Sequence, residues 1–92
     1  MRYELRYITP VAPDEAEILG NWLWHTAEER AADLADDASD GQRRIVADLF
    51  HIAADAIDSA AVVSIGQPRR EHYINRADWL RRRAEEITSD DN

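Results

Sequence analysis

The sequence has no cysteine and no lysine, and it holds three glycines, three prolines and one phenylalanine. Without cysteine the chain cannot form a disulfide bond, perform thiolate chemistry or build a cysteine-based zinc site. It also lacks an apolar run long enough to span a bilayer, and no charged-then-apolar leader stands at its start. These absences predict a soluble protein that works in the cytoplasm and contacts no membrane.

The charge of the chain is strongly acidic. All 11 basic residues are arginines, 19 residues are aspartate or glutamate, and the net charge is −8. An acidic surface repels phosphate, so the composition argues against general nucleic-acid binding. With 92 residues, the chain should form one domain with a modest core.

The first 13 residues differ in pattern from the rest. Tyr3, Leu5 and Tyr7 alternate with charged residues, which is the period of a half-buried β-strand. Because the rest of the chain predicts no second strand, this segment either lies as an extended arm over the helices or pairs with the same strand of another subunit. Pro10 and Pro13 should make the connection that follows stiff and extended.

The remainder of the chain predicts three helices, over residues 14–38, 40–65 and 68–87, and a polar tail over 88–92. Capping-box pairs open the first two helices, and a glycine and a proline follow the second. These signals are Asp14 with Glu17, Ser39 with Gln42, and Gly66 with Pro68. Three helices joined by short turns predict an all-α fold, an antiparallel three-helix bundle.

Two of the predicted helices present one apolar stripe each. The stripe of the first helix consists of Ala16, Leu19, Gly20, Leu23, Ala27, Ala31, Leu34 and Ala38. The stripe of the third helix consists of Tyr73, Ala77, Leu80, Ala84 and Ile87. Gly20 should weaken its helix by about 1 kcal/mol relative to alanine, unless another backbone packs closely against it.

The middle helix is apolar around about three-quarters of its circumference. Its polar residues form one narrow stripe, made of Arg44, Asp48, His51, Asp55 and Asp58. Two flanking helices with one apolar stripe each cannot cover so much apolar surface. We therefore expect a homo-oligomer, with a dimer favoured.

The polar stripe has three interpretations. It is a solvated edge, a set of partners for arginine residues, or a cation site in which Asp48, His51, Asp55 and Asp58 hold Zn²⁺ or Mn²⁺. Di-metal helical bundles use a Glu-x-x-His pair from each of two helices, whereas this chain has one Asp-x-x-His and no second copy. The solvated edge needs the fewest assumptions.

A second candidate surface lies on the third helix. Trp79 stands away from the apolar stripe, with Arg76 before it and Arg82 and Arg83 after it. A tryptophan between guanidinium groups could stack on a ring and neutralise phosphate, as in a nucleotide-binding protein, or dock an acidic partner. In the alternative, Trp79 packs against the N-terminal arm or another subunit and the arginines pair with acidic residues.

A third candidate surface lies on the first helix. Trp22 and Trp24 point about 200° apart, so they cannot both face one core. Trp24 borders the apolar stripe, while Trp22 and Ile18 form an apolar patch that is exposed unless the N-terminal arm covers it. Tryptophan is a common anchor of protein interfaces.

Signals for catalysis are weak. The chain has no glycine-rich phosphate loop and no nucleophile with a recognisable base, and its three histidines fall on three different helices. The hypothesis is a small acidic, non-catalytic protein without a cofactor, which binds a partner protein through Ile18 and Trp22 or through Trp79 and its neighbouring arginines. A phage-type accessory or inhibitor protein fits this size and composition. The alternatives are a small-ligand or nucleotide binder and a metal-dependent hydrolase.

Overall fold

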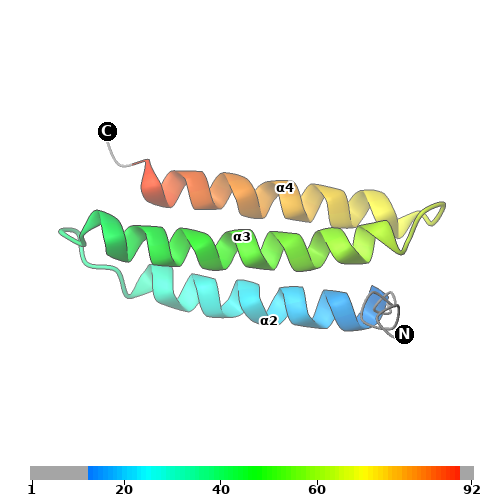
Figure 1. Cartoon of the computed structure of the whole chain (residues 1–92), viewed down its shortest axis with the longest axis horizontal. Helices are drawn as coiled ribbons and strands as arrows, with labels where there is room; N and C mark the ends of the chain where they lie inside the picture. Colours follow the sequence, from blue (N-terminus) through cyan, green and yellow to red (C-terminus); the bar gives the residue numbers. More distant parts are fainter. Residues whose placement is uncertain (1–12, 90–92) are drawn as a thin grey trace, which may run out of the picture.

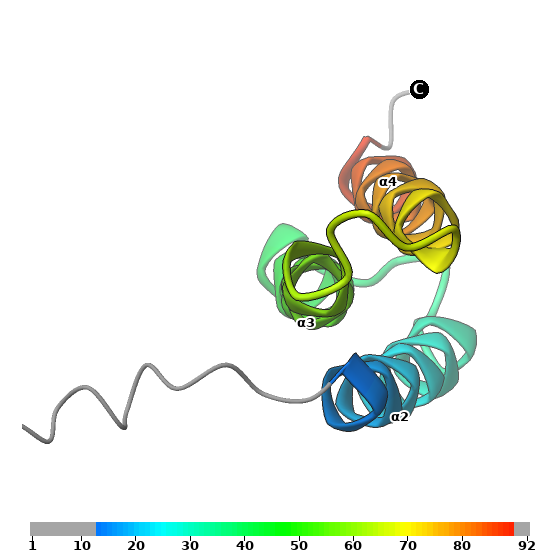
Figure 2. The same cartoon turned by 90° about the vertical axis from the view of Figure 1, so that its right-hand side faces the viewer.

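The computed structural model describes residues 13–89, which form three helices. Helix α2 spans Pro13–Ala32, α3 spans Asp40–Val62 and α4 spans Arg69–Thr88. Consecutive helices run in opposite directions (Figure 1). Seen end-on they form a triangle, in which α3 packs against both α2 and α4 (Figure 2). The all-α prediction is confirmed for these residues. The predicted N-terminal arm or strand falls on residues outside the described range.

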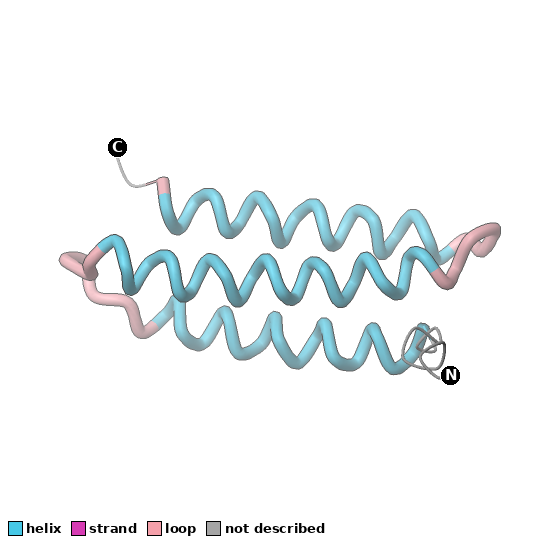
Figure 3. The backbone as a smooth tube through the Cα atoms, viewed as in Figure 1, coloured by secondary structure: helices cyan, strands magenta, loops and turns pink. Residues whose placement is uncertain are grey.

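The first helix is shorter than the sequence predicted. It ends at Ala32 instead of near residue 38, and an irregular link over residues 33–39 follows (Figure 3). The link is rich in aspartate, and negative charge is unfavourable at the end of a helix where the carbonyl groups are already negative. The link is held from outside, because Arg43 Nη2 donates a hydrogen bond to the carbonyl oxygen of Asp36 at 3.2 Å.

The ends of the other helices follow the predicted signals closely. Ser39 Oγ accepts a hydrogen bond from the Gln42 N–H at 3.1 Å, and Gln42 Oε1 accepts one from the Ser39 N–H at 3.0 Å, which confirms the capping box of α3. Helix α3 ends at Val62, slightly before the predicted residue 65, and Gly66 turns the chain with a φ of 83°. The bounds of α4 agree with the prediction within the ordinary spread of helix ends.

The capping box predicted at the start of α2 is wrong. Because α2 already begins at Pro13, Asp14 lies inside the first turn and does not cap the helix. The carboxylate of Glu17 turns toward α4 instead, where it accepts a hydrogen bond from Tyr73 Oη at 2.9 Å. A residue expected to act locally therefore joins two helices.

The core between the helices is built largely from alanine. Its buried apolar residues are Ala16, Ala27, Val46, Ala47, Phe50, Ala53, Ala54, Ile57, Ala60, Ala61, Tyr73, Ala77, Leu80, Ala84 and Ile87. The whole stripe predicted for the third helix is buried. Small side chains let helix axes approach closely, because the distance between packed helices depends on the side chains at the contact.

The apolar stripe predicted for the first helix faces the core at its centre, but Leu19 does not. Gly20 is buried, and a Cβ atom there would lie 2.7 Å from Ile57 Cγ1, so α2 and α3 approach closely at this point. Leu19 is 51% exposed because it lies on the flank of α2. Trp24, on the opposite flank, packs against the core.

Candidate functional site

Side chains from α2 and α4 meet along one edge of the bundle. The ring centroids of Trp24 on α2 and Trp79 on α4 lie 5.4 Å apart, and the rings are tilted by 58°. The Arg76 guanidinium lies 6.0 Å from the centre of the Trp24 ring. With Arg83, these residues form what we call the tryptophan–arginine junction. Sequence reasoning found its α4 half and missed the pairing of Trp24 with Trp79.

Arg76 is held by side chains of α2 and of its own helix. Its Nη1 donates to Asn21 Oδ1 at 3.1 Å and lies 3.5 Å from Glu17 Oε2, and its Nη2 lies 2.6 Å from His72 Nε2. Tyr73 donates to the same Glu17 carboxylate. Burial of Tyr73, followed by that hydrogen bond, raises the pKa of its phenol above the usual value. This cluster joins the start of α4 to α2 and neutralises the charge of Arg76.

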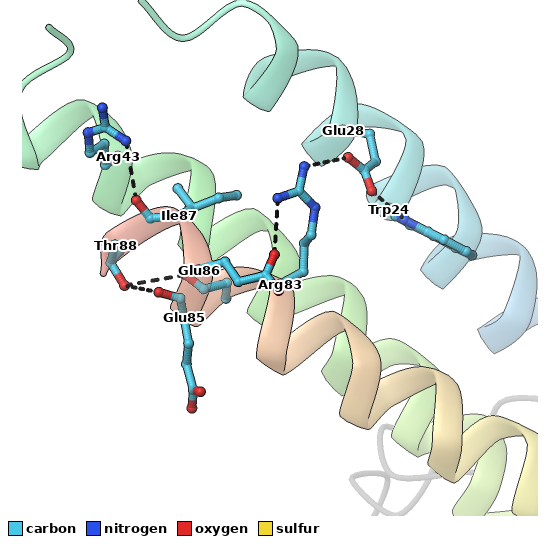
Figure 4. Close-up of polar contacts among 9 residues, drawn as sticks. Trp24, Glu28, Arg43, Arg83, Glu85, Glu86, Ile87 and Thr88 are labelled. Atoms are coloured by element: carbon cyan, nitrogen blue, oxygen red, sulfur yellow. Dashed lines mark hydrogen bonds and ion pairs between the residues drawn. The ribbon is translucent and has the colours of Figure 1, made fainter. Parts of the chain in front are cut away.

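Arg83 makes a second bridge between the two helices. Its Nη2 donates to Glu28 Oε1 on α2 at 3.3 Å, and its Nη1 lies 3.5 Å from Glu86 Oε1 on α4 (Figure 4). Trp24 Nε1 donates to the other oxygen of Glu28 at 3.2 Å, so the carboxylate holds an indole and a guanidinium together. The guanidinium also lies 5.5 Å from the centre of the Phe50 ring.

Arg82 does not join the junction. It pairs with Asp78 on its own helix at 3.1 Å, and both side chains point to solvent. The structure thus brings Arg76, Trp79 and Arg83 to α2 and leaves Arg82 outside. Each of these arginines already faces a carboxylate, so a phosphate group would have to displace an existing partner. This arrangement favours the packing interpretation of the arginines.

A cleft of about 510 Å³ opens beside the junction. Its lining residues are Asn21, Trp24, His25, Glu28 and Arg76. The volume lies in the range of small-molecule sites, and one indole face with polar groups around it could hold a planar molecule. Sequence reasoning missed the cleft because it forms between residues of two helices far apart in the chain.

Ile18 and Trp22 lie one turn apart on the outer side of α2. Their exposed fractions are 68% and 63%, which makes them the two most exposed large apolar side chains of this helix. Side chains four positions apart on a helix lie over each other, so the two form one continuous apolar patch. The cover that the sequence suggested for this patch, the N-terminal arm, lies outside the described residues.

The polar stripe of α3 divides into two parts. Arg81 of α4 forms ion pairs with Asp55 at 3.2 Å and with Asp58, and the hydrogen bond with Asp58 raises the pKa of its guanidinium. Asp48 and His51 are exposed. Within residues 13–89 no three potential ligands lie close enough together to hold a metal ion. Of the three interpretations of the stripe, pairing with arginine therefore applies to Asp55 and Asp58.

The structure also exposes an apolar surface that sequence reasoning did not single out. It lies on the sides of α2 and α3 that are turned away from α4, and we call it the α2–α3 face. Its residues are Leu19, Leu23, Ile45, Leu49, Ile52 and Ala56. Ile45 is 64% exposed and Ile52 is 49% exposed. The spacing of four, three and four residues along α3 is the signal that could have revealed this face.

In comparisons with known proteins, no family model matches the chain, and neither a curated protein nor a solved structure shows significant similarity to it. Among the helices of residues 13–89, none combines the length and the apolar character needed to cross a membrane. The functional argument therefore rests on the surfaces described above.

Proposed function

We propose that this chain is a small, non-catalytic protein-interaction module, which docks a partner protein through Ile18 and Trp22 and works as a homo-oligomer. The observation that supports the docking site most is the exposure of these two large apolar side chains together on a regular helix. Tryptophan is enriched among the few residues that dominate binding energy at interfaces. A helix also holds its side chains in place before binding, which lowers the cost of ordering them.

The charge around the patch indicates the chemistry of the partner. Asp14, Glu15 and Glu29 are exposed on α2, and the chain has a net charge of −8. A partner with an apolar pocket bordered by basic residues would match this surface and would associate faster because of it. An accessory or inhibitor protein of the phage type would act by occupying such a pocket on a host protein.

The tryptophan–arginine junction is the second docking candidate. Trp79 is 42% exposed, and Arg82 lies beside it on the outer side of α4. An acidic partner segment could contact these residues without breaking the bridges that Arg76 and Arg83 make to α2. We place this surface second because its tryptophan is already packed against Trp24.

The test of the docking site uses the full chain as bait in an extract of the organism that encodes it, followed by binding of the purified partner. We expect Trp22→Ala to weaken that binding by about 30-fold or more, as for an interface hot spot. Ile74→Ala is the matched control, because Ile74 is exposed on α4, away from the patch. Circular dichroism should show unchanged helix content in both variants. Equal binding by Trp22→Ala and the wild type would sink the docking site, and loss with Trp79→Ala alone would move it to the junction.

The cleft beside the junction favours one further candidate function, the binding of a small planar ligand such as a nucleotide. A ligand stacked on Trp24 would change tryptophan fluorescence, and Arg76→Ala would remove the change. The absence of a response to a nucleotide panel would remove nucleotides from consideration. A fluorescence change that persists in Arg76→Ala would place the ligand elsewhere.

A further inference from the structure

We propose that the α2–α3 face binds a second copy of this chain across a two-fold axis, so that α2 and α3 of both copies form a four-helix bundle. The proposal rests on the homo-oligomer part of the proposed function and assigns it a surface. It leaves Ile18 of the docking patch outside the interface and Trp22 at its border.

The α2–α3 face exposes large apolar side chains. In one chain, α4 packs against the side of α3 that carries Asp58. Ile45 is left mainly in water, Ile52 is about half exposed, and Leu49 is only partly buried. Large side chains exposed in a continuous row are uncommon on a monomer and are typical of an interface.

The residues of the face follow the same spacing on both helices. The positions along α3 are Ile45, Leu49, Ile52 and Ala56, and those along α2 are Leu19, Leu23, Thr26 and Arg30. Both sets follow intervals of four, three and four residues. This interval keeps a row of side chains on one line along a helix, so that another helix can pack lengthwise against it.

The α3 row is complementary to itself when a second copy of it runs in the opposite direction. If the second copy runs antiparallel, Ile45 faces Ala56 of the second copy, and Leu49 faces Ile52 of the second copy. A large side chain meets a small one at both ends, and two large ones meet in the middle, which fills the space evenly. A two-fold axis requires this kind of match, because each contact must occur twice.

One two-fold axis relates both helices to their copies. Gly20 packs against Ile57, which fixes the level of α2 along α3. At this level the centres of the two rows lie within about two residues of each other, or about 3 Å along the helices. A single two-fold axis can therefore pair α3 with α3 and α2 with α2 of the second copy.

The charges on the face agree with this arrangement. The row on α2 carries one charged residue, Arg30, in the last turn of the helix. Reversal of the second copy brings Arg30 within about one to two helical turns of Glu15 of that copy, and Glu15 lies in its first turn. The pairing occurs at both ends of the interface, and the acids of the polar stripe stay at its border.

The docking patch is partly outside this interface. Ile18 points about 100° away from Leu19 around the helix, toward the outside of the proposed bundle, whereas Trp22 lies about 60° from Leu19 and borders the interface. Self-association and partner binding can therefore be lost separately. This independence allows one set of variants to test each proposal without the other.

The first experiment measures the mass of the full chain by light scattering and sedimentation across a dilution series. We expect the wild type to have the mass of two chains at high concentration and of one chain on dilution. Ile52→Glu should remain one chain throughout, because the interface would bury an unpaired charge. Ile74→Glu is the matched control, since it places the same charge on an isoleucine exposed on α4, and it should associate like the wild type.

The second experiment tests the antiparallel arrangement. The chain has no cysteine, so any disulfide bond that forms must join introduced cysteines. Mild oxidation of a mixture of Ile45→Cys and Ala56→Cys variants should join the two different chains. Each variant alone should give little product, because its two cysteines would lie about 16 Å apart along the helices. Efficient linkage of Ile45→Cys to itself would overturn the antiparallel pairing of Ile45 with Ala56.

A wild type with the mass of one chain at every concentration would overturn the proposal as a whole. Association that survives Ile52→Glu would also overturn the assignment of the face. Partner binding is scored separately with Ile18→Ala, which should keep the mass of the wild type.

Discussion

Gly20 shows how one small residue determines the position of two helices. In isolation a glycine weakens a helix, because it gives the unfolded chain more freedom than alanine does. Here its missing side chain is replaced by Ile57, whose side chain is fully buried. The contact sets the height and the rotation of α2 on α3, and with them the sides on which Leu19 and Trp24 emerge.

The substitution Gly20→Ala should therefore destabilise the fold although alanine favours the helix. The new Cβ atom would lie 2.7 Å from Ile57 Cγ1, and overpacking of this kind costs about 1–3 kcal/mol against a gain of about 1 kcal/mol in helix propensity. We expect a net loss of about 1 kcal/mol in the free energy of unfolding, measured in urea. Gly41→Ala is the control, since its nearest neighbour would be Ser39 Oγ at 3.8 Å, and it should be neutral or stabilising. A Gly20→Ala protein as stable as the control would show that α2 and α3 do not approach so closely.

Tyr73 predicts a dependence of stability on alkaline pH. Burial and the hydrogen bond to Glu17 raise the pKa of its phenol, so the folded chain holds this proton more tightly than the unfolded chain. Stability is then complete below the unfolded pKa of about 10 and falls as pH rises from there through the higher folded pKa. The chain has neither lysine nor cysteine, so no other side-chain type is expected to titrate in that range.

The measurement is urea unfolding of the wild type and Tyr73→Phe at pH 8, 10 and 11. At pH 8 the variant should be less stable by about 1.5–3 kcal/mol, because it loses a hydrogen bond to a charged group. The difference should shrink as pH rises, because only the wild type keeps this titrating group. If the free energies of unfolding of the two proteins differed by the same amount from pH 8 to 11, this result would contradict the raised pKa of Tyr73.

At the scale of helices, the predictions succeeded where local chemistry decides the outcome. The capping box of Ser39 and Gln42 and the turn at Gly66 lie within a few residues of the ends that they set. The end of α2 was missed, and the link that replaces its last turns is held by Arg43 of the next helix through the carbonyl oxygen of Asp36. Local spacing holds no information about such a contact.

The contrast between local signals and contacts across the chain also explains which parts of the candidate sites could be predicted. The exposure of Ile18 and Trp22 followed from their angle to the apolar stripe, and the structure has both exposed. The contact between Trp24 and Trp79 joins residues far apart in the chain, so it could not be read from spacing. The α2–α3 face was present in the pattern of α3, but a helix that is apolar on most sides does not show which side its neighbours cover.

The capping box gives a prediction for a single helix. Ser39→Ala removes the side-chain oxygen that accepts from the Gln42 N–H, and loss of such a cap costs about 1 kcal/mol. We expect this decrease in urea unfolding, together with faster amide hydrogen exchange in the first turn of α3. Ser59→Ala is the control, because Ser59 Oγ donates to a carbonyl within its helix and caps no end. Equal exchange rates in the two variants would show that the cap does not hold this end.

For the whole molecule, the alanine-rich core and the open α2–α3 face together couple folding stability to association in the proposed dimer. Three helices of this length bury mostly small side chains, and the hydrophobic contribution to stability scales with the apolar area removed from water. Larger side chains such as Ile45 and Ile52 lie outside that core. A second copy would bury them, so association and folding stability should be coupled.

This coupling predicts a melting temperature that rises with protein concentration. A partner present at about 100 times its dissociation constant stabilises the folded state by about 2.7 kcal/mol, and in a small domain each kcal/mol shifts the midpoint by about 4–8 °C. We therefore expect the wild type to melt several degrees higher in concentrated than in dilute solution, followed by circular dichroism in cells of different path length. Ile52→Glu should melt at one temperature at all concentrations, close to that of the dilute wild type, because its side chain is already half in water in the single chain. A wild-type midpoint independent of concentration would mean that the three helices are stable without a second copy.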